Sequence, residues 1–121
     1  MFNTDTCCTL VPYFTVHEGK LDDFKALGPK FIERTKTEPD VLHYAFSFND
    51  NTAHCREGYK DAAGILAHLD NVGDLLTKAL ELSELTRLEV HGPADEIELL
   101  RKPLADLKPR FFVLEPGGIR R

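Results

Sequence analysis

The chain has 121 residues, 42% of them hydrophobic and 29% charged, which is the composition of a folded globular protein. Its net charge is -5 and its basic residues form no long run, so nucleic acid and acidic membrane surfaces are poor partners because like charges repel. No apolar segment reaches the roughly 20 residues that a membrane-spanning helix needs. These properties leave a small folded domain.

The cysteines and the N-terminal residues indicate a compartment. Cys7, Cys8 and Cys55 are an odd number with one adjacent pair, which is a poor disulfide framework and favours a reducing environment. Residues 1–9 lack the basic and apolar segments of a signal peptide. We therefore expect a cytoplasmic location.

The first elements are a strand and a helix. Residues 10–16 are mostly β-branched or aromatic and predict a strand, in which Pro12 cannot donate a ladder hydrogen bond. That strand therefore lies at an edge of its sheet or carries an irregularity. Apolar residues then recur at helical spacing and predict an amphipathic helix from residue 21 to about residue 36, with Pro29 inside it.

A β-hairpin follows a turn at residues 38–40. Apolar side chains alternate along its first strand at Leu42, Tyr44, Phe46 and Phe48. Residues 49–51 form a tight polar connection, and residues 52–59 return as the second strand. The alternating stripe is too apolar to face water, so we expect it to lie on the sheet face that the helices leave bare and to be covered there by another surface.

The second half of the chain repeats this order and then extends it. Asp61 is a candidate N-cap for a helix, Asn71 could cap a second helical segment, and residues 83–91 predict a fourth strand. Pro93 starts another helix, which Pro103 splits. The remaining elements are a short strand at residues 110–114 and a frayed tail at residues 116–118.

The predicted order is β-α-β-β-α-β followed by α-β. This is an α+β fold with a ferredoxin-like antiparallel sheet, in one domain over residues 1–121. The core spans about residues 9–92, and the helix and strand at about residues 93–114 are an extension. Helices for only one side of the sheet leave the other side uncovered, and a second copy of the chain is the simplest cover, so we expect a homodimer.

Three polar residues form the candidate catalytic set. Glu57 and Tyr59 share one face of their strand, and His68 lies beside the apolar stripe of the next helix. Glu57 could orient the imidazole, His68 could exchange a proton, and Tyr59 could donate to an oxyanion. Structural roles stay open: His68 could bond to a backbone carbonyl, Tyr59 could be a strand aromatic, and Glu57 could form an ion pair.

The pocket would lie between sheet and helices, where Phe14, Tyr44 and Phe46 are the candidate substrate-binding residues. No two histidines have the spacing that places two ligands on one metal, and no phosphate-binding loop is present. We therefore expect neither a metal nor another cofactor.

The strand that ends in Glu57-x-Tyr59, then Asp61 and a helix with Ala67-His68, resembles the antibiotic-biosynthesis-monooxygenase-type domain superfamily over about residues 9–92. The resemblance implies ferredoxin-like domains that pair as a dimeric α/β barrel. It places Glu57, Tyr59 and His68 at recurring positions. Oxygenase members commonly rely on tryptophan, which this chain lacks, so proton transfer on a small carbonyl compound suits these residues better.

Two functions follow as hypotheses. The first is a cofactor-independent oxygenase or isomerase-like enzyme acting on a small apolar carbonyl or phenolic metabolite. The alternative is a non-catalytic dimeric domain that binds a small molecule or a protein. A closed cavity that touches Glu57 and His68 favours the enzyme, whereas a filled core with His68 bonded to backbone favours the binding domain.

Overall fold

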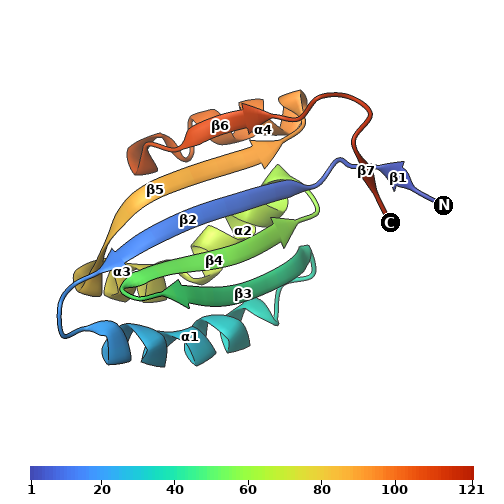
Figure 1. Cartoon of the computed structure of the whole chain (residues 1–121). Helices are drawn as coiled ribbons and strands as arrows, with labels where there is room; N and C mark the ends of the chain where they lie inside the picture. Colours follow the sequence, from blue (N-terminus) through green and yellow to red (C-terminus); the bar gives the residue numbers. More distant parts are fainter.

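The computed structural model describes residues 1–121. The strands are β1 (Asn3–Thr4), β2 (Cys8–Val16), β3 (Val41–Asn49), β4 (Thr52–Tyr59), β5 (Ser83–Gly92), β6 (Arg110–Val113) and β7 (Ile119–Arg120). The helices are α1 (Leu21–Thr35), α2 (Ala62–Asn71), α3 (Gly73–Leu82) and α4 (Ala94–Arg101), with a 3-10 turn at Ala105–Leu107. The helices cover one face of a twisted sheet (Figure 1). None of them is both long enough and apolar enough to cross a membrane.

The main sheet confirms the ferredoxin-like α+β fold and adds a fifth strand to it. Its strand order is β3-β4-β2-β5-β6, with antiparallel pairs throughout except for the parallel pair of β5 and β6. The chain leaves β5, crosses through α4 and returns in the same direction, which is the connection that parallel strands require. The sheet is therefore mixed rather than wholly antiparallel.

Pro12 lies in the central strand, so the expectation of an edge position is wrong, and that of an irregularity is confirmed. Pairing of β2 with β4 stops after Leu10 and resumes at Tyr13, and the register with β5 shifts after Tyr13. His54 Nδ1 donates to the free carbonyl of Pro12 at 2.7 Å. A central proline is tolerated because the hydrogen-bond ladder between β2 and β4 is interrupted at the position where its missing N–H would have donated.

The apolar stripe of β3 faces the helices, so the expectation that it forms part of the uncovered sheet face is wrong. Phe46 packs edge-on against Phe31 of α1 with ring centres 5.6 Å apart, and Phe48 packs against Phe24 at 6.2 Å. Tyr44 lies against the ring of His68 at 5.0 Å. An alternating pattern identifies which residues share a face but not which layer covers that face.

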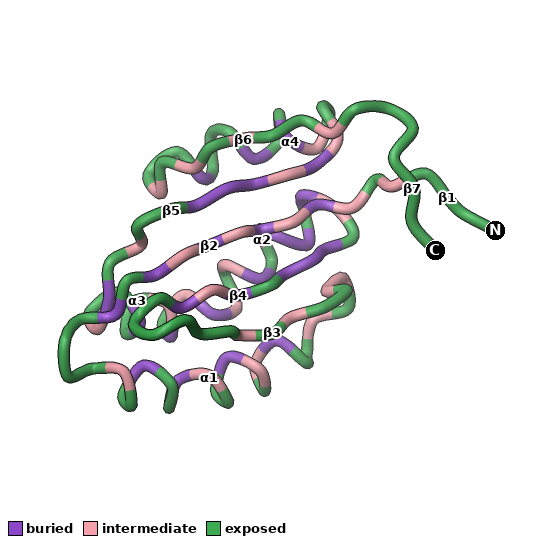
Figure 2. Tube along the Cα trace, in the orientation of Figure 1, coloured by how far each residue is buried: buried purple, intermediate pink, exposed green.

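Two buried clusters fill the space between sheet and helices, and the burial follows β2, β4 and β5 in Figure 2. One cluster joins β2 and β5 to α2 and α4 and includes Ile65, Ile97 and Leu100. The other joins β2 to α1 and α3 and includes Phe14 and Phe24. The C-terminal helix α4 thus packs into the core.

The termini pair with each other. Asn3 and Thr4 form an antiparallel ribbon with Arg120 and Ile119, and this ribbon projects from the body (Figure 1). The tail is therefore not frayed as expected. Pro103 does end a helix, since α4 stops at Arg101 and the chain continues into the 3-10 turn.

The uncovered face of the sheet carries mixed side chains. Alternation along β2 and β5 places Val11, Tyr13, Arg87, Glu89 and His91 there. The Glu89 carboxylate pairs with Arg87 and accepts from His91 Nε2 at 2.9 Å. Both partners lower the pKa of Glu89, with His91 the larger influence. Any partner on this face therefore meets a surface more polar than the sequence suggested.

We expect a second copy of the chain to cover this face and to bury roughly 2,000 Å² or more in total. The support is the fold resemblance and the half-buried apolar side chains of Val11 and Tyr13 among the charges. Val11→Lys should then dissociate the dimer at micromolar concentration, because it places an unpartnered charge in the interface. Leu99→Lys, on the exposed side of α4, is the control. Sedimentation equilibrium measures both, and a monomeric wild type would rule the dimer out.

Candidate functional site

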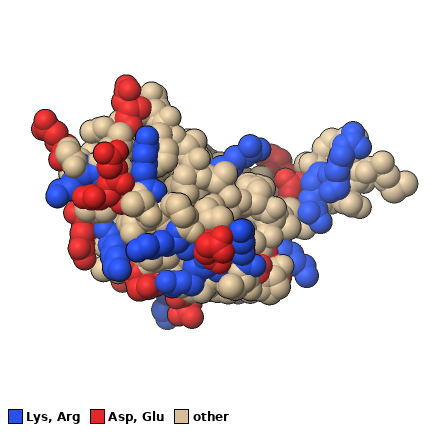
Figure 3. All heavy atoms as spheres, turned by 90° about the horizontal axis from the view of Figure 1, so that it is seen from below, with Lys and Arg blue, Asp and Glu red and all other residues tan.

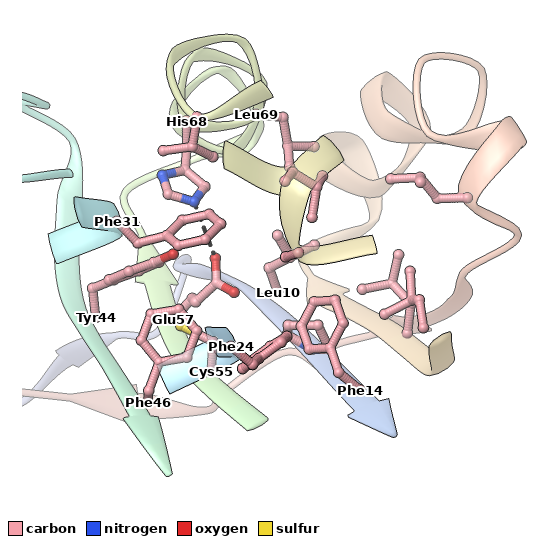
Figure 4. A pocket seen from close by; sticks show the side chains of 17 residues that line it. Leu10, Phe14, Phe24, Phe31, Tyr44, Phe46, Cys55, Glu57, His68 and Leu69 are labelled. Atoms are coloured by element: carbon pink, nitrogen blue, oxygen red, sulfur yellow. Dashed lines mark ion pairs between the residues drawn. The ribbon is translucent and has the colours of Figure 1, made fainter. Parts of the chain in front are cut away.

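A cavity of about 50 Å³ lies between the sheet and the helices. Of the 17 residues that line it, 14 are hydrophobic, and Glu57 and His68 bring the acid and base groups (Figure 4). The three residues expected to bind substrate, Phe14, Tyr44 and Phe46, all belong to its wall. The cavity is therefore apolar, with one polar corner formed by Glu57 and His68.

Local structure aims the polar groups at this corner. Strand alternation along β4 turns Cys55, Glu57 and Tyr59 toward the helices. The Asp61 side chain caps α2 by accepting from the Gly64 backbone N–H at 2.9 Å, which confirms its predicted role. The cap fixes the start of α2 so that His68, two turns later, points down onto β4.

The three predicted catalytic residues come together. The Tyr59 hydroxyl donates to Glu57 Oε1 at 2.7 Å, and His68 Nε2 lies 3.5 Å from the same oxygen. All three side chains are nearly inaccessible, with 5% exposure for Glu57, 2% for His68 and 0% for Tyr59. The geometry required for shared proton chemistry is present; whether these residues catalyse a reaction stays a prediction.

Glu38, which the sequence did not single out, holds the other side of the imidazole. Its two carboxylate oxygens lie 2.9 and 3.1 Å from His68 Nδ1. The Asn71 amide donates to Glu38 Oε2 at 2.8 Å, so Asn71 fixes this carboxylate and does not cap the next helix as expected. Glu38 rather than Glu57 therefore orients the ring, with the proton on Nδ1 and the free lone pair on Nε2 facing Glu57.

Burial sets the protonation of the corner. Desolvation raises the pKa of Glu57 from 4.5 to about 8, although the bond from Tyr59 opposes this. Desolvation also lowers the pKa of His68, against the bond to Glu38. At neutral pH the pair is thus a carboxylic acid facing a neutral imidazole. Because the Tyr59 hydroxyl donates to Oε1, we assign the acidic proton of Glu57 to Oε2.

Tyr44, not Tyr59, is the phenol that a ligand would meet. Tyr59 is fully buried and does not line the cavity, whereas the Tyr44 hydroxyl points toward Glu57 and His68 (Figure 4). Burial, reinforced by the Glu57 charge, raises the pKa of Tyr44, so its hydroxyl stays a donor. Tyr59 does not reach the cavity itself, but its hydrogen bond positions the Glu57 carboxyl group.

Comparison with solved structures identifies the type of fold. Antibiotic biosynthesis monooxygenase function is attributed to a protein from Nitrosomonas europaea that matches at 14% identity over 78% of this chain and 96% of its own, with a TM-score of 0.67. A protein from Chloroflexus aurantiacus, attributed the same function, matches at 17% identity over 74% and 94%, with a TM-score of 0.61. The fold is thus that of the antibiotic-biosynthesis-monooxygenase type.

A relative with much higher sequence identity shows the family of the chain. MupZ from Pseudomonas fluorescens is 49% identical over 92% of both chains, with a TM-score of 0.88. The chain therefore belongs to the same family as MupZ. No family model matches the sequence, and no curated protein is similar enough to count as a relative.

Proposed function

We propose that this protein is a cofactor-independent, isomerase-like enzyme that moves a proton on a small apolar carbonyl or phenolic metabolite. The observation that carries the proposal is an acid and a base, Glu57 and His68, held 3.5 Å apart at one corner of an otherwise apolar cavity. Enzymes separate such roles by pushing the pKa values of neighbouring groups in opposite directions.

The chemistry follows from the protonation states. A substrate carbonyl oxygen accepts hydrogen bonds from Glu57 Oε2–H and from the Tyr44 hydroxyl. His68 Nε2 takes the proton from the adjacent carbon, and the electron pair of that C–H bond forms a C=C double bond. The π pair of the carbonyl moves onto oxygen, which takes the proton of Glu57 to give an enol. The Glu38 carboxylate stabilises the imidazolium that forms. The imidazolium then gives its proton to another carbon of the enol while the enol O–H returns its proton to Glu57, which completes an isomerisation and restores both residues.

The competing hypothesis is a non-catalytic binding domain, in which His68 would bond to backbone within a filled core. Instead, both ring nitrogens face carboxyl groups, and the cavity touches His68 and Glu57 together. A purely structural imidazole needs neither arrangement. These contacts favour an enzyme over a binding domain.

His68→Gln should slow exchange of ketone α-protons with D₂O by about 10² to 10⁴-fold, because the variant lacks the base. Proton NMR of 2-hexanone and 2-octanone with the purified protein measures the rate. His17→Gln, at an exposed histidine before α1, is the matched control and should exchange as the wild type does. Equal rates in the wild type and His68→Gln for both ketones would contradict the proposal.

A further inference from the structure

The cavity beside Glu57 and His68 is too small to hold a whole metabolite. Small-molecule sites occupy roughly 300–1,000 Å³, whereas this cavity of about 50 Å³ has room for only a few water molecules. A metabolite with a reactive group beside Glu57 must therefore extend beyond the cavity walls.

An open groove of about 440 Å³ adjoins the cavity between α1 and β3. Phe24, Tyr44 and Phe46 line both spaces, so a single layer of aromatic side chains separates them. The groove itself is bordered by Ile32 and Phe48. Cavity and groove are thus two parts of one apolar path that those three rings interrupt.

The seam between α1 and β3 is held only by side chains. No backbone hydrogen bond joins the two elements, and Phe31 and Phe46 meet across the seam with ring centres 5.6 Å apart. Gly28, on the groove side of α1, leaves Phe46 room, since a Cβ atom there would lie 3.9 Å from the Phe46 ring. Rotation of Phe46 and Tyr44 therefore breaks packing contacts but no backbone bonds.

Lys25 and Glu33 are the charged residues among those that line the groove. Lys25 Nζ lies 4.9 Å from the centre of the Phe48 ring at one end of the groove, and Glu33 borders it as well. Lys, Arg, Asp and Glu side chains mix over the surface that carries α1, with no field of one sign (Figure 3). This groove suits an uncharged apolar chain better than an ionic group.

We propose that the ligand is a carbonyl compound with an alkyl tail, which enters between α1 and β3 and keeps that tail in the groove. The position of the carbonyl group rests on the proposed function, whereas the position of the alkyl tail is inferred from the groove alone. Affinity should therefore rise with chain length, by about fourfold for each methylene buried.

Isothermal titration with 2-hexanone, 2-octanone and 2-decanone tests this. In the wild type Kd should fall along the series by on the order of 10²-fold from the first to the last. Gly28→Leu fills the groove and should weaken 2-decanone binding at least tenfold while leaving the thermal melt unchanged or raised, because leucine is the better helix former. Gly73→Leu, in α3 with open space around its Cβ, is the matched control.

The outcomes separate the two proposals. Chain-length dependence in the wild type that Gly28→Leu removes supports the groove, even if no ketone exchanges its protons. A wild type without chain-length dependence, or a Gly28→Leu protein that binds 2-decanone as tightly as the wild type, overturns it, even if exchange is fast. Should Gly28→Leu lower the melt, Ile32→Lys places a charge in the groove wall and must give the same loss of binding.

Discussion

Glu57→Gln should be more stable than the wild type at pH 8, by on the order of 4 kcal/mol at most, and should show no such advantage at pH 4. Burial raises the pKa of Glu57 from 4.5 in the unfolded chain to about 8 in the folded one. Between these values the folded state binds one more proton than the unfolded state, so wild-type stability falls as pH rises. Glutamine cannot titrate and still accepts from Tyr59.

His68 changes the pH dependence of folding stability in the opposite direction to Glu57. Its pKa is lowered on folding, so the stability associated with it is lost as pH falls through the ordinary histidine range. That contribution is common to the wild type and Glu57→Gln and largely cancels in their difference. Urea unfolding from pH 4 to 8 measures the difference, with Glu98→Gln, at an exposed glutamate on α4, as the control. Parallel stability curves for the wild type and Glu57→Gln would show that Glu57 titrates normally.

Truncation after Gly92 should unfold the protein. Ile97, Leu100 and Leu104 are 0%, 0% and 3% exposed and pack into the cluster that contains Tyr59. Burial of three such side chains contributes roughly 5–9 kcal/mol, which is comparable with the whole stability of a small domain. The loss also bares the β5 edge that β6 now pairs with.

The matched control is truncation after Glu115, which removes only the β7 half of the terminal ribbon and should change the melt by a few degrees at most. Circular dichroism melts compare the two. A cooperative melt of the shorter protein at the wild-type temperature would show that α4 is dispensable. Phe112 of β6 is 45% exposed, so α4 rather than β6 supplies the fully buried residues of this segment.

Local periodicity determined the elements and one half of the site. Period-two alternation placed Glu57 and Tyr59 on one face of a strand, and helical spacing placed His68 at the edge of an apolar stripe. Those patterns need only neighbouring residues, because strand and helix geometry repeats every two or 3.6 residues. The order of elements, and from it the ferredoxin-like fold, followed from the same signals.

Only the tertiary structure decided which side chains of the sheet and the helices contact each other. Glu38 reaches His68 from a turn 30 positions earlier, and no local pattern distinguishes it from any other acidic turn residue. Likewise, the stripe of Tyr44 and Phe46 could face helices or a partner, since alternation is the same in both cases. The docking of α1 over the edge strand β3 decided this, because the contacts of remote elements depend on packing and not on sequence spacing.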